Sequence, residues 1–186
     1  MVGLVQVDRG TLQEQSKLAR FELLVVPYMG AAYNLARWLT RNEHDAEDVV
    51  QEAYLRAYRF FEGFHGGDGR TWLLAIVRNT CYTWLQQNRK PTIELEEDVP
   101  ELDGGRSNPE ALLLRGIDSE MLRQALDDLP VEFREAIVLR ELEGLSYKEI
   151  GAIAGVPLGT VMSRLARARS RLQRALQGQA RQGGAA

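Results

Sequence analysis

Residues 145–172 read LSYKEIGAIAGVPLGTVMSRLARARSRL, and this stretch predicts two helices joined by a tight turn. Ser146 and Glu149 have the spacing of a capping box, which satisfies the free amides at a helix start. Gly155 suits the left-handed conformation that ends a helix, and Pro157 suits the first turn of the next one. The stretch therefore predicts a helix-turn-helix.

The second of these helices has two different faces. Apolar residues spaced four, three and four apart predict one buried stripe, formed by Val161, Leu165, Ala168 and Leu172. The opposite side carries Ser163, Arg164, Arg167, Arg171 and Arg174. No acidic residue interrupts the helix, whereas an ordinary solvated helix usually mixes both signs. A helix with one buried apolar face and one cationic face fits the DNA major groove. An arginine stripe can, alternatively, be only a solvated face.

The composition excludes several classes of protein. The chain has 186 residues, a net charge of −3, one cysteine and two histidines. A single cysteine, Cys81, excludes an internal disulfide and a cysteine-based zinc site, and the histidines are too scattered for a metal site. The longest uncharged stretch, 23–36, is shorter than the ~20 residues that span a bilayer, and the start shows no signal-sequence pattern. We expect a reduced, soluble, cytoplasmic protein without metal or cofactor.

Charge is segregated along the chain, and this marks a linker. Residues 91–110 contain seven acidic residues against one basic residue, with three prolines and a Gly-Gly pair. The segment has no periodic apolar face, so we expect no regular structure in it. The sequence predicts an all-α fold of two small helical bundles joined by a flexible acidic linker. The expected boundaries are a first bundle at 1–90, the linker at 91–117, a second bundle at 118–178 and a disordered tail at 179–186.

Helical periodicity dominates both predicted bundles. The pattern predicts a helix at 21–40 bent at Pro27, one at 45–61 capped by Asp45, one at 72–88 capped by Thr71, and one at 132–143. The expected apolar stripe of the 45–61 helix is Val49, Val50, Ala53, Ala57 and Phe60. Off this stripe lie Asp48, Gln51, Glu52, Leu55 and Arg56. These residues fit a solvated outer face, or alternatively a docking face for a basic partner.

The segment from the glycine-rich loop through the third helix combines aromatic side chains with basic ones. The rings belong to Phe64, His65, Trp72, Tyr82 and Trp84, and the cations to Arg70, Arg78, Arg89 and Lys90. Aromatic rings stack on single-stranded bases while arginines hold phosphates. The alternative is that the rings are core residues, and we expect Trp72 and Trp84 to be partly buried. Cys81 is interpreted as a small packing residue.

Taken together, these segments resemble a bacterial RNA polymerase sigma factor of the extracytoplasmic-function (ECF) group. The resemblance covers residues 20–176 and rests on DAEDVVQEAYLRAYR at 45–59, TWLLAIVRNTCYTWLQQNRK at 71–90, and the helix-turn-helix region at 129–172. It implies a promoter-recognition subunit that directs transcription initiation and is not an enzyme. The implied partners are core RNA polymerase, through its β′ clamp helices and β flap, promoter DNA, and a cognate anti-sigma factor. No direct insertion into a membrane is implied.

The resemblance also assigns three sets of residues. Docking on the β′ clamp helices is implied for Asp48, Gln51, Glu52, Leu55 and Arg56. Contacts with the minus-ten element are implied for Phe64, His65, Arg70, Trp72, Arg78, Asn79, Tyr82 and Arg89. In the minus-thirty-five element, contacts with bases are implied for Met162, Ser163, Ala166 and Arg167. Contacts with phosphates are implied for Thr160, Arg164 and Arg171.

Two positions depart from the family pattern. Met162 stands where members often carry Lys or Arg, and Ala166 stands where they often carry a bulkier side chain. Fewer direct hydrogen bonds to bases are then available, so thymine methyl groups are the expected contacts of these two side chains. Two other classes of protein remain as alternatives: a helix-turn-helix regulator that binds its operator without polymerase, and an interaction module whose arginine face meets an acidic protein.

Overall fold

The computed structural model describes residues 9–88 and 119–183, and every regular element in these ranges is helical. The first range contains α1 (Arg9–Leu24), η1 (Val26–Tyr28), α2 (Met29–Thr40), α3 (Glu43–Phe60), η2 (Phe61–Gly63) and α4 (Gly69–Asn88). The second contains α6 (Ser119–Asp127), α7 (Val131–Ile137), η3 (Val138–Leu142), α8 (Tyr147–Ala154) and α9 (Leu158–Gly183). The predicted all-α fold is confirmed. The predicted linker at 91–117 lies outside the described residues.

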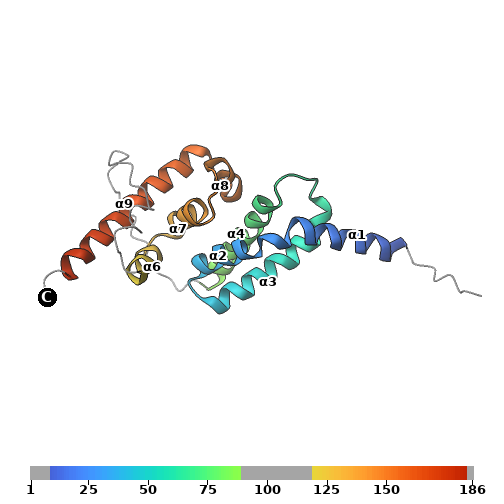
Figure 1. Cartoon of the computed structure of the whole chain (residues 1–186), viewed down its shortest axis with the longest axis horizontal. Helices are drawn as coiled ribbons and strands as arrows, with labels where there is room; N and C mark the ends of the chain where they lie inside the picture. The colour runs from blue at the N-terminus through green and yellow to red at the C-terminus, as the bar shows by residue number, and fades with distance from the viewer. Residues whose placement is uncertain (1–8, 89–118, 184–186) are drawn as a thin grey trace, which may run out of the picture.

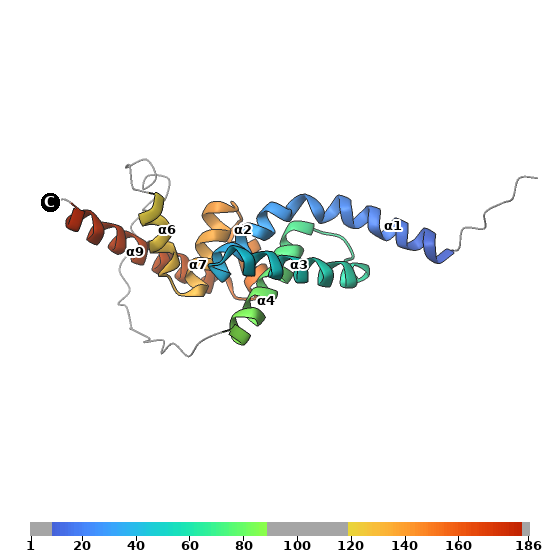
Figure 2. The ribbon, with the colours of Figure 1, turned by 90° about the horizontal axis from the view of Figure 1, so that it is seen from below.

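The first bundle is formed by α2, α3 and α4, which pack on one another, while α1 and α9 extend toward opposite ends of the molecule (Figures 1 and 2). The ring of Phe21 on α1 makes edge contacts with Tyr54 and Tyr58 of α3 and with Phe61. The expected stripe on α3 is confirmed at Val49, Ala53 and Ala57, which are buried, whereas Val50 is half-buried and Phe60 is 62% exposed. Phe60 is the last residue of α3, and the ring of the next residue, Phe61, is the one buried in the core.

Three local predictions in the first bundle are wrong in detail. Pro27 lies in η1 and separates α1 from α2, so the predicted bent helix is two helices. The cap of α3 is Asn42, whose side chain accepts from the amides of His44 and Asp45 at 2.9 and 3.1 Å. The amides of Arg70 and Thr71 at the start of α4 donate to the carboxylate of Asp68, each at 3.1 Å. The expected caps, Asp45 and Thr71, therefore each lie inside a first helical turn.

The second bundle confirms the predicted helix-turn-helix. The Ser146 hydroxyl accepts from the Glu149 amide at 3.3 Å, and the Glu149 carboxylate accepts from the Ser146 amide at 2.7 Å. Gly155 ends α8 with a φ of 67°. The predicted stripe of α9 is buried at all four positions, Val161, Leu165, Ala168 and Leu172. The α9 backbone continues to Gly183, into the segment where we expected a disordered tail.

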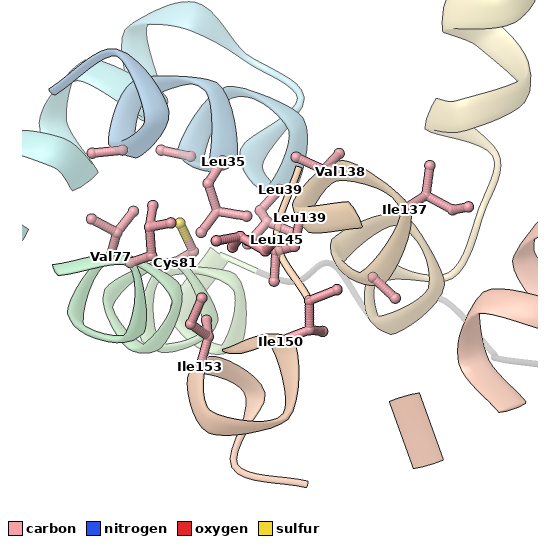
Figure 3. Close-up of a cluster of buried hydrophobic side chains, with 14 of the residues drawn as sticks. Leu35, Leu39, Val77, Cys81, Ile137, Val138, Leu139, Leu145, Ile150 and Ile153 are labelled. Carbon is pink, nitrogen blue, oxygen red and sulfur yellow. The ribbon is translucent and has the colours of Figure 1, made fainter. Parts of the chain in front are cut away.

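The two bundles are packed against each other, which the sequence did not predict. Helix α4 lies against α8, and α2 lies against α7. Buried apolar side chains from both bundles meet in one cluster (Figure 3). The first bundle contributes Leu35, Leu39, Val77 and Cys81, and the second contributes Val138, Leu139, Leu145, Ile150 and Ile153. This seam joins the bundles independently of the segment between them.

Candidate polymerase and nucleic-acid interfaces

The outer face of α3 is an acidic surface with an apolar centre. Asp48, Gln51 and Glu52 are exposed, and the Leu55 side chain is 60% exposed. Arg56 is half-buried, and its Nε lies 2.6 Å from Oε1 of Glu52 one turn earlier. An exposed leucine on the same face as two carboxylates suits a docking partner, because charges at the edge orient a partner while the apolar side chain is buried in the contact.

The aromatic residues that open the next segment belong largely to the core. The ring of Phe64 is 6% exposed and lies 5.9 Å from that of Phe61 and 5.0 Å from that of Trp72. Trp72 is half-buried, as expected. In this conformation Phe64 is closed to a DNA base, contrary to the expected role of this side chain. His65 and Asn79 are exposed, and Arg89 lies outside the described residues.

Three predicted minus-ten residues project from α4 toward the second bundle. The Nε of Arg78 lies 2.6 Å from Oε1 of Glu135, and the Tyr82 hydroxyl donates to the other oxygen of Glu135 at 3.0 Å. Arg70 donates through Nη2 to the Glu143 carboxylate at 2.6 Å and to the Glu143 carbonyl at 2.9 Å. The structure thus pairs all three residues with carboxylates of the second bundle, Glu135 of α7 and Glu143 directly after η3.

Burial strengthens the pairing around Glu135, whose side chain is 1% exposed. Burial alone would lower the pKa of Arg78, but the adjacent Glu135 carboxylate outweighs that effect and raises it. Burial, and then the same carboxylate, raises the pKa of the Tyr82 hydroxyl. Both side chains therefore keep their protons and remain donors to Glu135 at any physiological pH.

The recognition helix α9 presents most of its predicted base readers to solvent. Ser163, Ala166 and Arg167 are exposed, and Met162 is 49% exposed. Leu158, also 49% exposed, lies one turn before Met162 and extends the apolar line formed with Ala166. Sequence reasoning missed Leu158, although its spacing of four from Met162 was a signal for it.

The cationic front of α9 is narrower than the sequence pattern suggests. Arg164 is half-buried, and its Nη1 lies 3.8 Å from the Glu135 carboxylate. The guanidinium of Arg171 lies over the Phe133 ring at 5.3 Å. Arg169 pairs with Glu141 at 2.7 Å. The expectation that Arg164 and Arg171 share one open face is therefore wrong in this conformation, because α7 packs against that flank.

Other kinds of site find little support in the parts of the chain that the structure describes. No group of His, Cys, Asp and Glu there has the arrangement of a metal site. No helix there is long and apolar enough to cross a membrane. Cys81 is fully buried, and this burial raises the pKa of the thiol to about 12, so it stays protonated and unreactive.

Comparison with known families accounts for both bundles. Residues 24–90 match Sigma-70 region 2, and residues 119–176 match Sigma-70 region 4. The Escherichia coli ECF RNA polymerase sigma-E factor is 42% identical over 171 residues, which cover 84% of this chain and 86% of that protein. The chain belongs to the ECF group of RNA polymerase sigma factors. Such factors are non-catalytic subunits for promoter-specific transcription initiation.

A second ECF relative and two solved structures agree with this assignment. The ECF sigma factor SigE of Mycolicibacterium smegmatis is 38% identical over 161 residues, and this chain spans 63% of its length. The structure of the sigma factor RpoE of Bartonella quintana in complex with the anti-sigma factor NepR gives a TM-score of 0.64, with 30% identity over 85% of this chain and 97% of that one. CnrH, bound to the cytosolic domain of CnrY, gives 0.59 with 26% identity over 85% and 88%.

Proposed function

We propose that this ECF sigma factor binds core RNA polymerase through α3 and reads the two promoter elements through α4 and α9. The observation that carries the proposal is that one chain combines an acidic docking face on α3, an arginine- and tyrosine-bearing helix α4 and a recognition helix α9 with exposed polar residues. A single-element regulator needs only the last of these. The matches to both sigma regions favour a factor that uses all three over a regulator that reads one DNA element.

The docking step uses the outer face of α3. We assign Asp48, Gln51, Glu52 and Leu55 to the clamp helices of the polymerase β′ subunit, with Arg56 holding Glu52 in place through their ion pair. The exposed Leu55 supplies apolar contact area, and the surrounding carboxylates orient a basic partner helix. The β flap is assigned to the second bundle.

The minus-ten step uses the loop before α4 and one flank of that helix. His65 and Asn79 are open to solvent, and Arg70, Arg78 and Tyr82 follow one another along α4. Arginines neutralise phosphates of the melted strand, and a tyrosine ring stacks on an unpaired base for about 1–3 kcal/mol. Phe64 supports the loop from the core beside Trp72 rather than meeting a base.

The minus-thirty-five step uses the exposed line of α9. Arg167 and Ser163 are assigned to hydrogen bonds with base edges, while Met162 and Ala166 meet thymine methyl groups in the major groove. Thr160, Arg164 and Arg171 lie at the flanks of this line, where the groove presents phosphates. Arg164 and Arg171 must leave Glu135 and Phe133 to reach them.

The same comparisons support a regulatory partner and a place of action. The B. quintana RpoE structure contains an anti-sigma factor, and that of CnrH contains the cytosolic domain of CnrY. We assign an anti-sigma factor to this chain on that basis, and cytoplasmic action beside the chromosome. The proposal is tested by run-off transcription with purified core polymerase and a promoter library. Discrete transcripts that require the chain support it, and identical transcripts with and without the chain refute it.

A further inference from the structure

Arg169 lies on a different side of α9 from the residues assigned to bases of the DNA. Two residues along an α-helix correspond to a rotation of about 200°, so Arg169 and Arg167 point in nearly opposite directions. Arg167 is exposed, whereas Arg169 is half-buried. The buried Nε of Arg169 has no hydrogen-bond partner in the described parts of the chain, and its Nη2 donates to Oε1 of Glu141 at 2.7 Å. This arginine is therefore directed at the protein and not at the groove of the DNA.

The Arg169 side chain connects three elements of the second bundle. Glu141 belongs to η3, Tyr147 is the first residue of α8, and Arg169 extends from α9. Burial alone would lower the pKa of Arg169, but hydrogen bonds to Glu141 and Tyr147 outweigh that effect and raise it. Arg169 therefore stays charged at physiological pH while it is bound to both partners. We call these three residues the Arg169 cluster.

The backbone that carries Glu141 has an unusual conformation. Glu141 lies in η3, a five-residue π-helical turn. Such turns are rare, and they are often found at functional sites. Arg140 in the same turn donates through Nη1 to the Leu145 carbonyl at 2.8 Å, and its guanidinium lies over the Tyr147 ring at 5.2 Å. The turn thus supplies both the carboxylate that binds Arg169 and a cation that holds the Tyr147 ring.

The Arg169 cluster adds direction to a contact that is otherwise apolar. The buried stripe of α9 packs on the bundle through the hydrophobic effect, which is not directional. A charge-assisted hydrogen bond between a guanidinium and a carboxylate has a defined geometry. On another flank of α9, about 140° round the helix, Arg164 lies near Glu135. When Arg164 leaves Glu135 to reach a phosphate, the Arg169 cluster still connects α9 to η3 and α8.

We propose that Arg169 is a positioning residue for minus-thirty-five readout, which fixes the angle between α9 and α8 through Glu141 and Tyr147. The proposal rests on the proposed minus-thirty-five function, and it names residues that determine specificity without touching DNA. Hydrogen bonds to base edges need donor–acceptor distances of about 2.7–3.2 Å, so a small rotation of α9 removes them. Phosphate contacts carry no sequence information. Loss of the Arg169 cluster therefore reduces discrimination among promoters more than it reduces affinity for unrelated DNA.

The test measures binding of the holoenzyme to fluorescent promoter duplexes that carry either a selected minus-thirty-five element or the same element with one base pair changed. The ratio of the two affinities gives the discrimination, and a series of salt concentrations gives the number of phosphates neutralised. Arg169→Met keeps an unbranched apolar chain but removes the guanidinium. We expect discrimination to fall at least about fivefold, which corresponds to one weak base contact, while the log–log salt slope stays at the wild-type value.

Two further variants remove the partners of Arg169 without changing α9. Glu141→Gln removes the carboxylate, and Tyr147→Phe removes the hydroxyl but keeps the ring beside Arg140. If Arg169 bound DNA directly, either variant would free it, and binding would be unchanged or tighter. Because Arg169 positions α9, we expect both variants to lose discrimination at an unchanged salt slope. If circular dichroism shows that Arg169→Met does not fold, these two variants decide.

Arg171→Met is the matched control, because it makes the same substitution at an arginine assigned to a phosphate. This control should weaken binding to all elements equally and reduce the salt slope by about 0.9. The same pattern in Arg169→Met would overturn the proposal, since Arg169 would then be a phosphate ligand.

The remaining outcomes are also distinct. Lost discrimination at a constant salt slope in Arg169→Met and Glu141→Gln supports the positioning role. Wild-type discrimination in both variants overturns it, even if their melting temperatures fall, because the cluster would then serve stability alone. A wild-type holoenzyme that does not distinguish the two elements overturns the proposed minus-thirty-five function, and the positioning role with it.

Discussion

A β-carbon on Gly69 would lie 2.2 Å from the carbonyl oxygen of Leu24. The start of α4 therefore touches the end of α1 through backbone atoms, and this contact sets where α4 emerges from the loop. Gly69→Ala would force the two helices apart, and we expect a loss of about 1–3 kcal/mol of folding free energy. Thermal denaturation followed by circular dichroism measures it. Gly63→Ala is the matched control, because nothing lies within 4 Å of its added carbon. Equal melting temperatures of the two variants would contradict the close packing.

The buried thiol of Cys81 predicts a loss of stability at alkaline pH. Its pKa is raised from 9.0 to about 12 by burial, so above about pH 9 the unfolded chain loses a proton that the folded chain retains. The contribution of the protonated Cys81 thiol to the unfolding free energy is thus complete below pH 9 and is lost as the pH rises toward 12. The unfolding free energy should fall by up to about 1.4 kcal/mol per pH unit. Denaturant titrations of wild type and Cys81→Ala between about pH 9 and 10 check this, since the variant should lack that part of the slope.

Reversing one charge on the α3 face should weaken holoenzyme assembly. Glu52→Lys replaces a carboxylate beside Leu55 with a cation that repels a basic partner helix, so we expect core polymerase to bind at least about tenfold more weakly. Fluorescence anisotropy of a labelled chain titrated with core polymerase measures the affinity. Glu62→Lys, an exposed position in η2 off this face, makes the same change of charge and should leave assembly intact. Equal losses in both variants would place the docking surface elsewhere.

The apolar line on α9 predicts sensitivity to a single methyl group of the DNA. Replacing thymine by deoxyuridine opposite Met162 removes one methyl contact, which should weaken holoenzyme binding by about 0.8 kcal/mol, or roughly fourfold. The same replacement should have no effect on Met162→Ala, because the partner of the methyl group is then missing. A scan of deoxyuridine along a selected minus-thirty-five element makes the comparison. An undiminished response in Met162→Ala would show that another side chain meets the methyl group.

The sequence predicted those features of the fold that are determined by residues close together in the chain. The capping box at Ser146 and the glycine at 155 depend only on neighbouring residues, and both lie where their spacing placed them. The stripe of α9 follows from helical periodicity in the same way. The cap of α3 was missed because Asn42 and Asp45 are both good capping residues, and only the backbone path selects between them.

Contacts between the bundles could not be predicted in this way. Nothing near Glu135 in the sequence shows that its partners lie more than fifty residues away on α4. The face of Arg78 and Tyr82 looked free because a helical pattern shows which side is polar, and not what covers that side. Phe64 was ambiguous for the same reason, since an aromatic ring in a glycine-rich loop suits either a base or a core.

As a sigma factor, this chain should read promoters only as part of a polymerase holoenzyme. The most direct test is the affinity of a selected promoter duplex for the chain alone, for core polymerase alone and for their mixture, at one salt concentration. We predict weak binding by either component and tight, sequence-specific binding by the mixture. Equally tight and specific binding by the chain alone would contradict it, and would identify a regulator that acts without polymerase.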